Sequence, residues 1–146
     1  MKPINQQAPV VCAQSVLIHA TPTRVWRVLS DIAQWPTWQR DVSRAQLHGP
    51  LQPRTTFDWK TGGMHIHSTL HTVEPEKRLG WTGEVFGIHA VHNWEFEAKP
   101  GGTQVSVSES MEGLLARLFK GAFNRTLAKG MGQSLRELKI ACEAMA

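Results

Sequence analysis

The chain of 146 residues contains no tyrosine, only two cysteines and no long apolar run. The lack of any run of about 18 apolar residues excludes a membrane-spanning helix. The first nine residues are polar and form no apolar signal-peptide core, so we expect no export signal and a cytoplasmic location. Cys12 and Cys142 are far apart in a chain without an export signal, and we expect two free, buried thiols.

The sequence also lacks several patterns that mark common functions. The formal charge is only +4, and no cluster of Lys and Arg alternates with aromatic residues, so we do not expect nucleic-acid binding. No Gly-x-Ser-x-Gly motif is present, and neither cysteine lies in a nucleophile motif. The Gly-x-Gly at Gly130–Gly132 falls within an expected helix and is no phosphate-binding loop.

What the chain does contain is enough apolar material for a core. Hydrophobic residues make up 41% and charged residues 19%, which is typical of a globular protein, and the length predicts a single domain over 1–146. Six tryptophans dominate the aromatic residues. Each tryptophan buries a large apolar area and carries one N–H donor, which suits a core or a ligand pocket.

The last third of the chain, Gly113–Ala146, predicts one long amphipathic helix. At ~1.5 Å per residue, about thirty helical residues extend roughly 45 Å, so we expect part of the helix to pack on a sheet and part to overhang. Glycines at 121, 130 and 132 are where we expect it to bend. Its apolar residues recur at steps of three and four: Leu115, Leu118, Phe119, Ala122, Phe123, Leu127, Met131, Leu135, Leu138 and Cys142.

The first elements are a strand and a short helix. Val10–Ala20 alternates in the manner of a strand. Thr21-Pro22 then supplies an N-cap and a proline at the first helical position, which predicts a helix ending near Asp31.

A second, broken turn is expected to follow at Gln34–Trp38. Pro36 has no N–H to donate and disfavours the helical conformation in Trp35, so the first helix should not continue. We expect this turn to place two indoles at one end of the domain.

From Asp41 to Glu112 the pattern changes to alternation with period two, broken by turns rich in Gly and Pro. Such short connections join antiparallel neighbours, so with the first strand we expect about seven strands in a meander. The six further strands are predicted at Val42–His48, Thr55–Thr61, Met64–Val73, Leu79–Val85, Ile88–Ala98 and Thr103–Met111.

Alternation within these strands predicts one sheet face toward the helix and one toward solvent. The solvent face should carry Asp58 and a row of histidines. The helix-facing set is Phe57, Trp59, Met64, Ile66, Ser68, Leu70, Leu79, Trp81, Gly83, Ala90, His92, Trp94, Phe96, Val105, Val107, Glu109 and Met111.

Several segments together resemble one known family. The segment 21–38 is similar to the first helix pair of the START/polyketide cyclase-dehydrase superfamily, also called SRPBCC or helix-grip. Further similarities are Val73-Glu74-Pro75, Arg78–Trp81, Ala90–Phe96 and Glu109–Gly113, in the family's order. The resemblance implies an α+β helix-grip fold: a seven-stranded curved antiparallel sheet around a long C-terminal helix, with two short helices after the first strand. It also implies a hydrophobic cavity between sheet and helix, the alternative being that the two pack solid.

The histidines allow two interpretations. His65, His67 and His71 lie on one strand, and imidazoles can bind zinc, copper or nickel. Their parity places them opposite Ile66 and Leu70, on the solvent face. We therefore interpret them as a solvated row, and we expect no metal and no cofactor.

His92 and Glu109 are different because their parity points them inward. Imidazole can donate or accept a proton near neutral pH, so His92 is a candidate general acid or base. A buried carboxylate must be paired, protonated or hydrated, and Glu109 is a candidate partner. The alternative is that the two residues form a purely structural pair.

Three functions remain open at this stage. The first is binding of a small hydrophobic molecule of the lipid, isoprenoid or aromatic polyketide type. The second is a cyclase/dehydrase-type enzyme with catalytic His92 and Glu109, and the third is a partner-binding or chaperone domain. An exposed edge strand or helix end would also allow a homodimer. The candidate ligand-binding residues are Trp59, Ile66, Ser68, Leu70, Trp81, His92, Trp94, Glu109, Phe119, Phe123, Leu127 and Met131.

Overall fold

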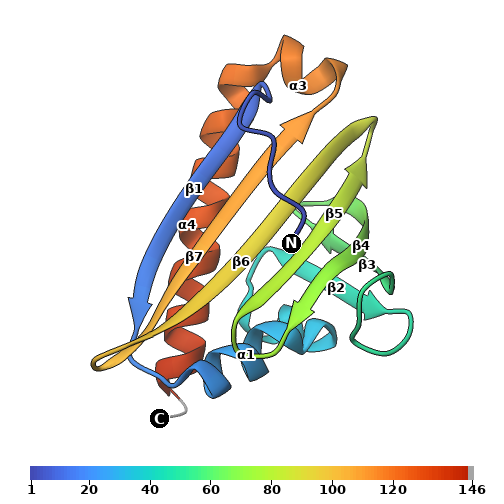
Figure 1. Ribbon diagram of the computed structural model, residues 1–146. Helices are drawn as coiled ribbons and strands as arrows, with labels where there is room; N and C mark the ends of the chain where they lie inside the picture. Colours follow the sequence, from blue (N-terminus) through green and yellow to red (C-terminus); the bar gives the residue numbers. More distant parts are fainter. Residues whose placement is uncertain (145–146) are drawn as a thin grey trace.

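The computed structural model describes residues 1–144, in which a seven-stranded antiparallel sheet curls around a long helix (Figure 1). The strand order is β1-β7-β6-β5-β4-β3-β2, so the first strand pairs with the last and the others form a meander. The strands are β1 (Val10–Ile18), β2 (Val42–Leu47), β3 (Thr56–Thr61), β4 (Met64–Glu74), β5 (Arg78–Val85), β6 (Ile88–Lys99) and β7 (Gly102–Glu112). The predicted α+β class, seven strands and helix-facing parity are confirmed.

The first helix forms as its sequence predicts. Helix α1 (Pro22–Ser30) begins after Thr21, whose hydroxyl accepts a hydrogen bond from the Arg24 N–H at 3.2 Å. A one-turn 3-10 helix η1 (Ile32–Gln34) and a short helix α2 (Trp35–Trp38) follow.

The expectation for Trp35 is wrong in one respect. Trp35 has helical angles, φ −50° and ψ −39°, because Pro36 lies in the first turn of α2, where its missing N–H costs nothing. The Trp35 indole is fully buried and donates its Nε1–H to the Leu29 carbonyl at 2.9 Å. It therefore closes one end of the sheet as expected, while Trp38 is only half-buried.

The C-terminal helix is not continuous as predicted. It is divided into α3 (Leu114–Leu118) and α4 (Lys120–Ala144), and the break lies at Phe119 rather than at a glycine. The predicted helical residues Met145 and Ala146 lie outside the described residues.

The buried side chains of α4 all lie from its middle onward: Met131, Leu135, Leu138 and Cys142. This part packs on the core. The first part does not overhang the sheet as expected but lies along β1, where the Val11 N–H donates to Asn124 Oδ1 and Gln14 donates to the Ala128 carbonyl.

The outer face of the sheet is not fully open to solvent, contrary to the alternation pattern. Residues 1–9 cross the sheet on the side away from α4 (Figure 1). Asn93 donates to the Lys2 carbonyl at 2.8 Å, and the Asn5 N–H donates to Ser110 Oγ at 3.0 Å. As a result, Val91 and Asn93 are buried on this face. The sequence gives no sign of this, because the first nine residues are polar.

Candidate functional site

A cavity of about 310 Å³ lies between the inner face of the sheet and the first part of α4. Its volume is at the lower end of the range for small-molecule sites. Side chains from the sheet form one wall, and Phe123, Leu127 and Met131 of α4 form the other. Leu29 and Trp35, from α1 and α2, close one end. The sequence marks both residues as buried, but nothing in it indicates that they line a cavity.

Most of the candidate ligand-binding residues lie together on this cavity, but two do not. Leu70 faces inward as predicted, yet it packs in the closed core. Phe119 was expected to face inward, and this is wrong: it lies at the helix break and is 57% exposed. The residues that do line the cavity are Trp59, Ile66, Ser68, Trp81, His92, Trp94, Glu109, Phe123, Leu127 and Met131.

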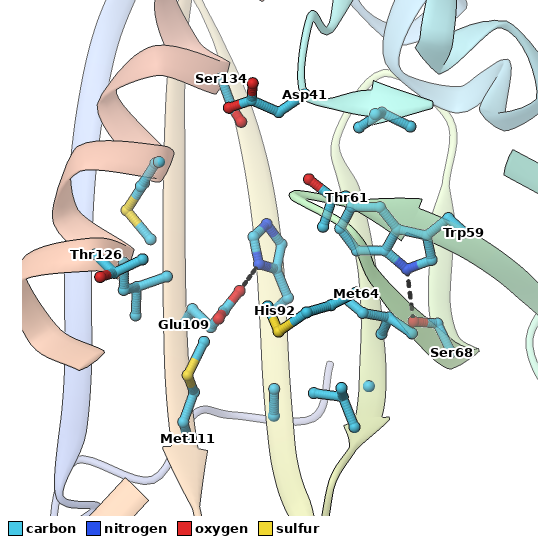
Figure 2. Close-up of a pocket in the computed structure, with 18 of the residues that line it drawn as sticks. Asp41, Trp59, Thr61, Met64, Ser68, His92, Glu109, Met111, Thr126 and Ser134 are labelled. Atoms are coloured by element: carbon cyan, nitrogen blue, oxygen red, sulfur yellow. Dashed lines mark hydrogen bonds and ion pairs between the residues drawn. The ribbon is translucent and has the colours of Figure 1, made fainter. Parts of the chain in front are cut away.

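His92 and Glu109 form a directly opposed cross-strand pair on β6 and β7. Figure 2 shows their side chains pointing toward each other, with the His92 Nδ1 in contact with the Glu109 carboxylate. Glu109 is only 7% exposed, and the His92 ring stacks on Trp81 with a centroid distance of 4.7 Å. The carboxylate accepts from the Nδ1–H, which fixes the orientation of the imidazole.

The other ring nitrogen of His92 remains available to a ligand. Nε2 is buried and has no hydrogen-bond partner among the described residues. With the proton on Nδ1, a neutral His92 presents the lone pair of Nε2, which can accept a hydrogen bond or a proton.

Two further polar groups lie among the apolar lining. Trp59 donates its Nε1–H to Ser68 Oγ at 3.1 Å, across the strand pair β3–β4 (Figure 2). The Ser68 hydroxyl keeps its own proton to donate. The Nε1–H of Trp94 is buried and has no partner among residues 1–144. An apolar cavity with a few fixed polar groups can orient a ligand by one polar end.

The histidine row lies on the outer face as predicted, but its three members do not form one group: His65 and His67 contact Asp58, and His71 does not. His65 and His67 lie 2.9 and 3.0 Å from Asp58 Oδ1, and His48 lies 2.7 Å from Oδ2. Partial burial acts to raise the pKa of Asp58, but the hydrogen bonds from His67, His48 and His65 outweigh it and lower the pKa to about 2. Within the described part of the chain, no group of three or more His, Cys, Asp or Glu could hold a metal ion.

His71 is separated from this row by a β-bulge between Leu70 and Thr72. Its ring lies over Gly80, where a Cβ atom would come within 2.3 Å of it, and its Nδ1 lies 2.8 Å from Thr72 Oγ1. Burial lowers the pKa of His71 to about 4, the positive charges of Lys2 and the N-terminus add to this, and a hydrogen bond with Asn93 opposes it. His71 is therefore neutral in the folded protein at ordinary pH.

Acidification is expected to weaken the fold through His71. The unfolded state binds a proton at this residue below about pH 6.5, whereas the folded state does so only near pH 4. The free energy of unfolding should therefore fall across this window by about 1–2 kcal/mol, after allowance for the partial exposure of the ring. Urea unfolding at pH 7 and pH 4 measures this loss.

The matched comparison is between His71→Gln and His19→Gln. The first variant should lose less stability than wild type on acidification, because glutamine does not titrate. His19 is exposed, so the second variant should follow wild type. Equal acid sensitivity of His71→Gln and wild type would contradict the assignment.

The two cysteines are free. Cys142 is buried as predicted, and burial raises the pKa of its thiol to about 12, so it is unreactive. Cys12 is only half-buried, contrary to expectation. Neither thiol lines the cavity.

Comparisons with known proteins agree with this architecture. Residues 10–143 match the sequence profile of the family described as "Polyketide cyclase / dehydrase and lipid transport". No curated protein sequence matches the chain. Within residues 1–144, no helix has the length and apolar character needed to cross a membrane.

Solved structures with the same fold share little sequence with the chain. A hypothetical protein from Helicobacter pylori superposes with a TM-score of 0.84 at 18% identity, over 97% of both chains. The ZhuI aromatase/cyclase from Streptomyces sp. R1128 gives 0.76 at 13% identity, over 91% of this chain and 93% of its own. A START superfamily protein from Mycobacterium smegmatis gives 0.72 at 10% identity, over 93% and 99%.

Proposed function

The chain belongs to the polyketide cyclase/dehydrase and lipid transport family, and from this premise we propose that it binds a small hydrophobic molecule between its sheet and α4. The cavity is the observation that carries the proposal. If sheet and helix packed solidly there would be no cavity, yet about 310 Å³ is left between the sheet and the first part of α4. We propose that the ligand is of the lipid, isoprenoid or aromatic polyketide type, with its polar end toward His92.

The lining supports a ligand that is mostly apolar. Trp81 and Trp94 offer flat apolar surfaces, and Met131 can adapt to an irregular shape. The volume favours one ring system or one short chain over a molecule with two long acyl chains. We also propose a cytoplasmic location, because both thiols are free.

Filling the cavity should abolish binding. Ala90 lines the cavity on β6, so Ala90→Phe places a ring where the ligand would lie. With 1-anilinonaphthalene-8-sulfonate as the fluorescent probe, we expect affinity to fall at least tenfold, because the site no longer has room. Titration of probe fluorescence measures the affinity, and native mass spectrometry of the purified protein tests for a natural ligand.

The control makes the same substitution outside the cavity. Ala98 is exposed on the same strand, and Ala98→Phe should bind the probe as wild type does. Unchanged affinity in Ala90→Phe would refute binding in this cavity.

The His92–Glu109 pair favours a second candidate function, a cyclase/dehydrase-type enzyme. In this function Nε2 of His92 takes a proton from the substrate, and the Glu109 carboxylate stabilises the imidazolium that forms. The same proton can then return to another substrate atom, so no external acid is needed. Turnover of a poly-β-keto substrate that is lost in His92→Gln while affinity remains would identify an enzyme rather than a carrier.

A further inference from the structure

The end of the molecule that carries α3 exposes an unusual amount of apolar surface. Of the eight large hydrophobic residues exposed in the described part of the chain, four lie in or next to α3 and one lies in the β5–β6 turn. Of these five, the most exposed are Phe86 at 74%, Leu114 at 69% and Leu118 at 63%. Single exposed apolar residues are ordinary, but a cluster of them indicates an interaction site.

These residues lie at one place in the fold. A Cβ on Gly113 would come within 2.5 Å of the Gly87 carbonyl oxygen, so the start of α3 touches the β5–β6 turn. Figure 1 shows α3 and this turn at the same end of the molecule. We call the set Phe86, Leu114, Leu115, Leu118 and Phe119 the apolar end.

The local structure keeps these side chains outward. The only buried residue of α3 is Ala116, so this short helix turns its leucines to solvent and its smallest side chain to the protein. Phe86 has φ +46° and is followed by Gly87 at φ +73°, which is a two-residue hairpin turn. Asparagine is favoured at the first position of such a turn, whereas phenylalanine is strained there. Neither the outward leucines of α3 nor the outward Phe86 contributes to the packing of the core.

The helical segment that carries most of the apolar end contains charge of one sign. Between residues 113 and 136 the chain has no Asp or Glu and five basic residues, all exposed: Arg117, Lys120, Arg125, Lys129 and Arg136. None of the five takes part in an ion pair in the described residues. Two acidic residues border the apolar end outside this segment: Glu84, which contacts His89, and Glu112, which accepts a hydrogen bond from Asn5.

We propose that the apolar end is a docking surface for a bilayer that contains anionic lipids. Apolar side chains with Arg117 and Lys120 between and beside them in the sequence, and with further basic residues along α4, match the boundary between acyl chains and negative headgroups. Leu115 and Phe86 belong to this surface and also line the cavity. Docking would therefore set one end of the cavity against the membrane, where an apolar ligand could pass without crossing water.

Vesicle flotation with the full chain tests this surface. Wild type should bind vesicles of phosphatidylcholine with 30% phosphatidylglycerol at low salt. Binding should be at least fivefold weaker to vesicles of pure phosphatidylcholine, and at least fivefold weaker to the anionic vesicles in 0.5 M NaCl. Phe86→Asn with Leu118→Gln should reduce binding at least tenfold. Asparagine suits the turn, so this variant should fold. Lys120→Glu should reduce binding about fivefold. This variant should fold, because acidic residues are favourable at the start of a helix.

The controls repeat each change away from the apolar end. Ile140 is 68% exposed on the packed half of α4, so Ile140→Gln should bind as wild type does. Lys77→Glu, at the exposed β4–β5 turn, should also retain binding. The proposal is overturned if wild type does not bind the anionic vesicles at low salt. If, in addition, wild type sediments as a dimer and the variant Phe86→Asn with Leu118→Gln does not, the apolar end is a dimer interface instead. Probe binding in solution stands or falls separately, because it needs no membrane.

Discussion

Replacing Trp35 with alanine is expected to lower the free energy of unfolding by about 3–5 kcal/mol, the usual range for removing a fully buried aromatic side chain. The Trp35 ring lies 5.6 Å from Phe57 and 5.3 Å from both Trp59 and Trp81, between centroids. It is therefore the common contact of three aromatic rings, and the void left by its removal cannot be filled by one neighbour. Urea unfolding followed by circular dichroism measures the loss.

Two further variants separate the contributions. Trp35→Phe keeps an aromatic ring but loses the hydrogen bond to the Leu29 carbonyl, so it should cost less than Trp35→Ala. Trp38 is only half-buried, so Trp38→Ala should also lower the free energy of unfolding by less than Trp35→Ala does. A loss below about 1 kcal/mol in Trp35→Ala would contradict the central position of this residue.

Replacing His92 with phenylalanine is expected to cost about 3 kcal/mol, although the new side chain is apolar. The phenylalanine ring can keep the stack on Trp81, so the change removes little packing. It does leave the Glu109 carboxylate buried without its partner. Removing the one hydrogen-bond donor to a buried carboxylate is more damaging than removing both groups.

The double variant His92→Phe with Glu109→Leu is the decisive comparison. Without the carboxylate there is no buried charge to satisfy, so its stability should return to within about 1 kcal/mol of wild type. Equal stability of the single and double variants would show that Glu109 gains nothing from His92. Recovered stability without recovered probe binding would place the role of the pair in the cavity rather than in the fold.

Alternation of side chains predicted correctly which sheet residues face the helix. Trp81, His92 and Glu109 lie on three neighbouring strands, and period-two parity alone turns them to the same face. The two-residue turn between Lys99 and Gly102 sets the register of β6 and β7, and in that register His92 lies opposite Glu109. The inward direction of these polar residues therefore follows from the sequence pattern alone.

The features that the sequence could not predict depend on tertiary contacts. Phe119 continues the apolar spacing of the helix, yet the chain breaks there and the side chain is exposed. The cavity depends on the distance between the first part of α4 and the sheet. The spacing of apolar residues shows which side of the helix faces the sheet, but it does not give that distance. The path of residues 1–9 across the outer face depends on single hydrogen bonds, such as that from Asn93 to the Lys2 carbonyl.

The pairing of β1 with β7 also sets the order of events during folding. Val10 lies opposite Met111 and Ile18 opposite Thr103, whereas each strand from β2 to β6 pairs with the next one along the chain. During synthesis the meander can form progressively, but β1 has no partner until β7 has left the ribosome. Closing a loop of about one hundred residues is slow compared with closing a hairpin. The first strand to be made is therefore the last to join the sheet.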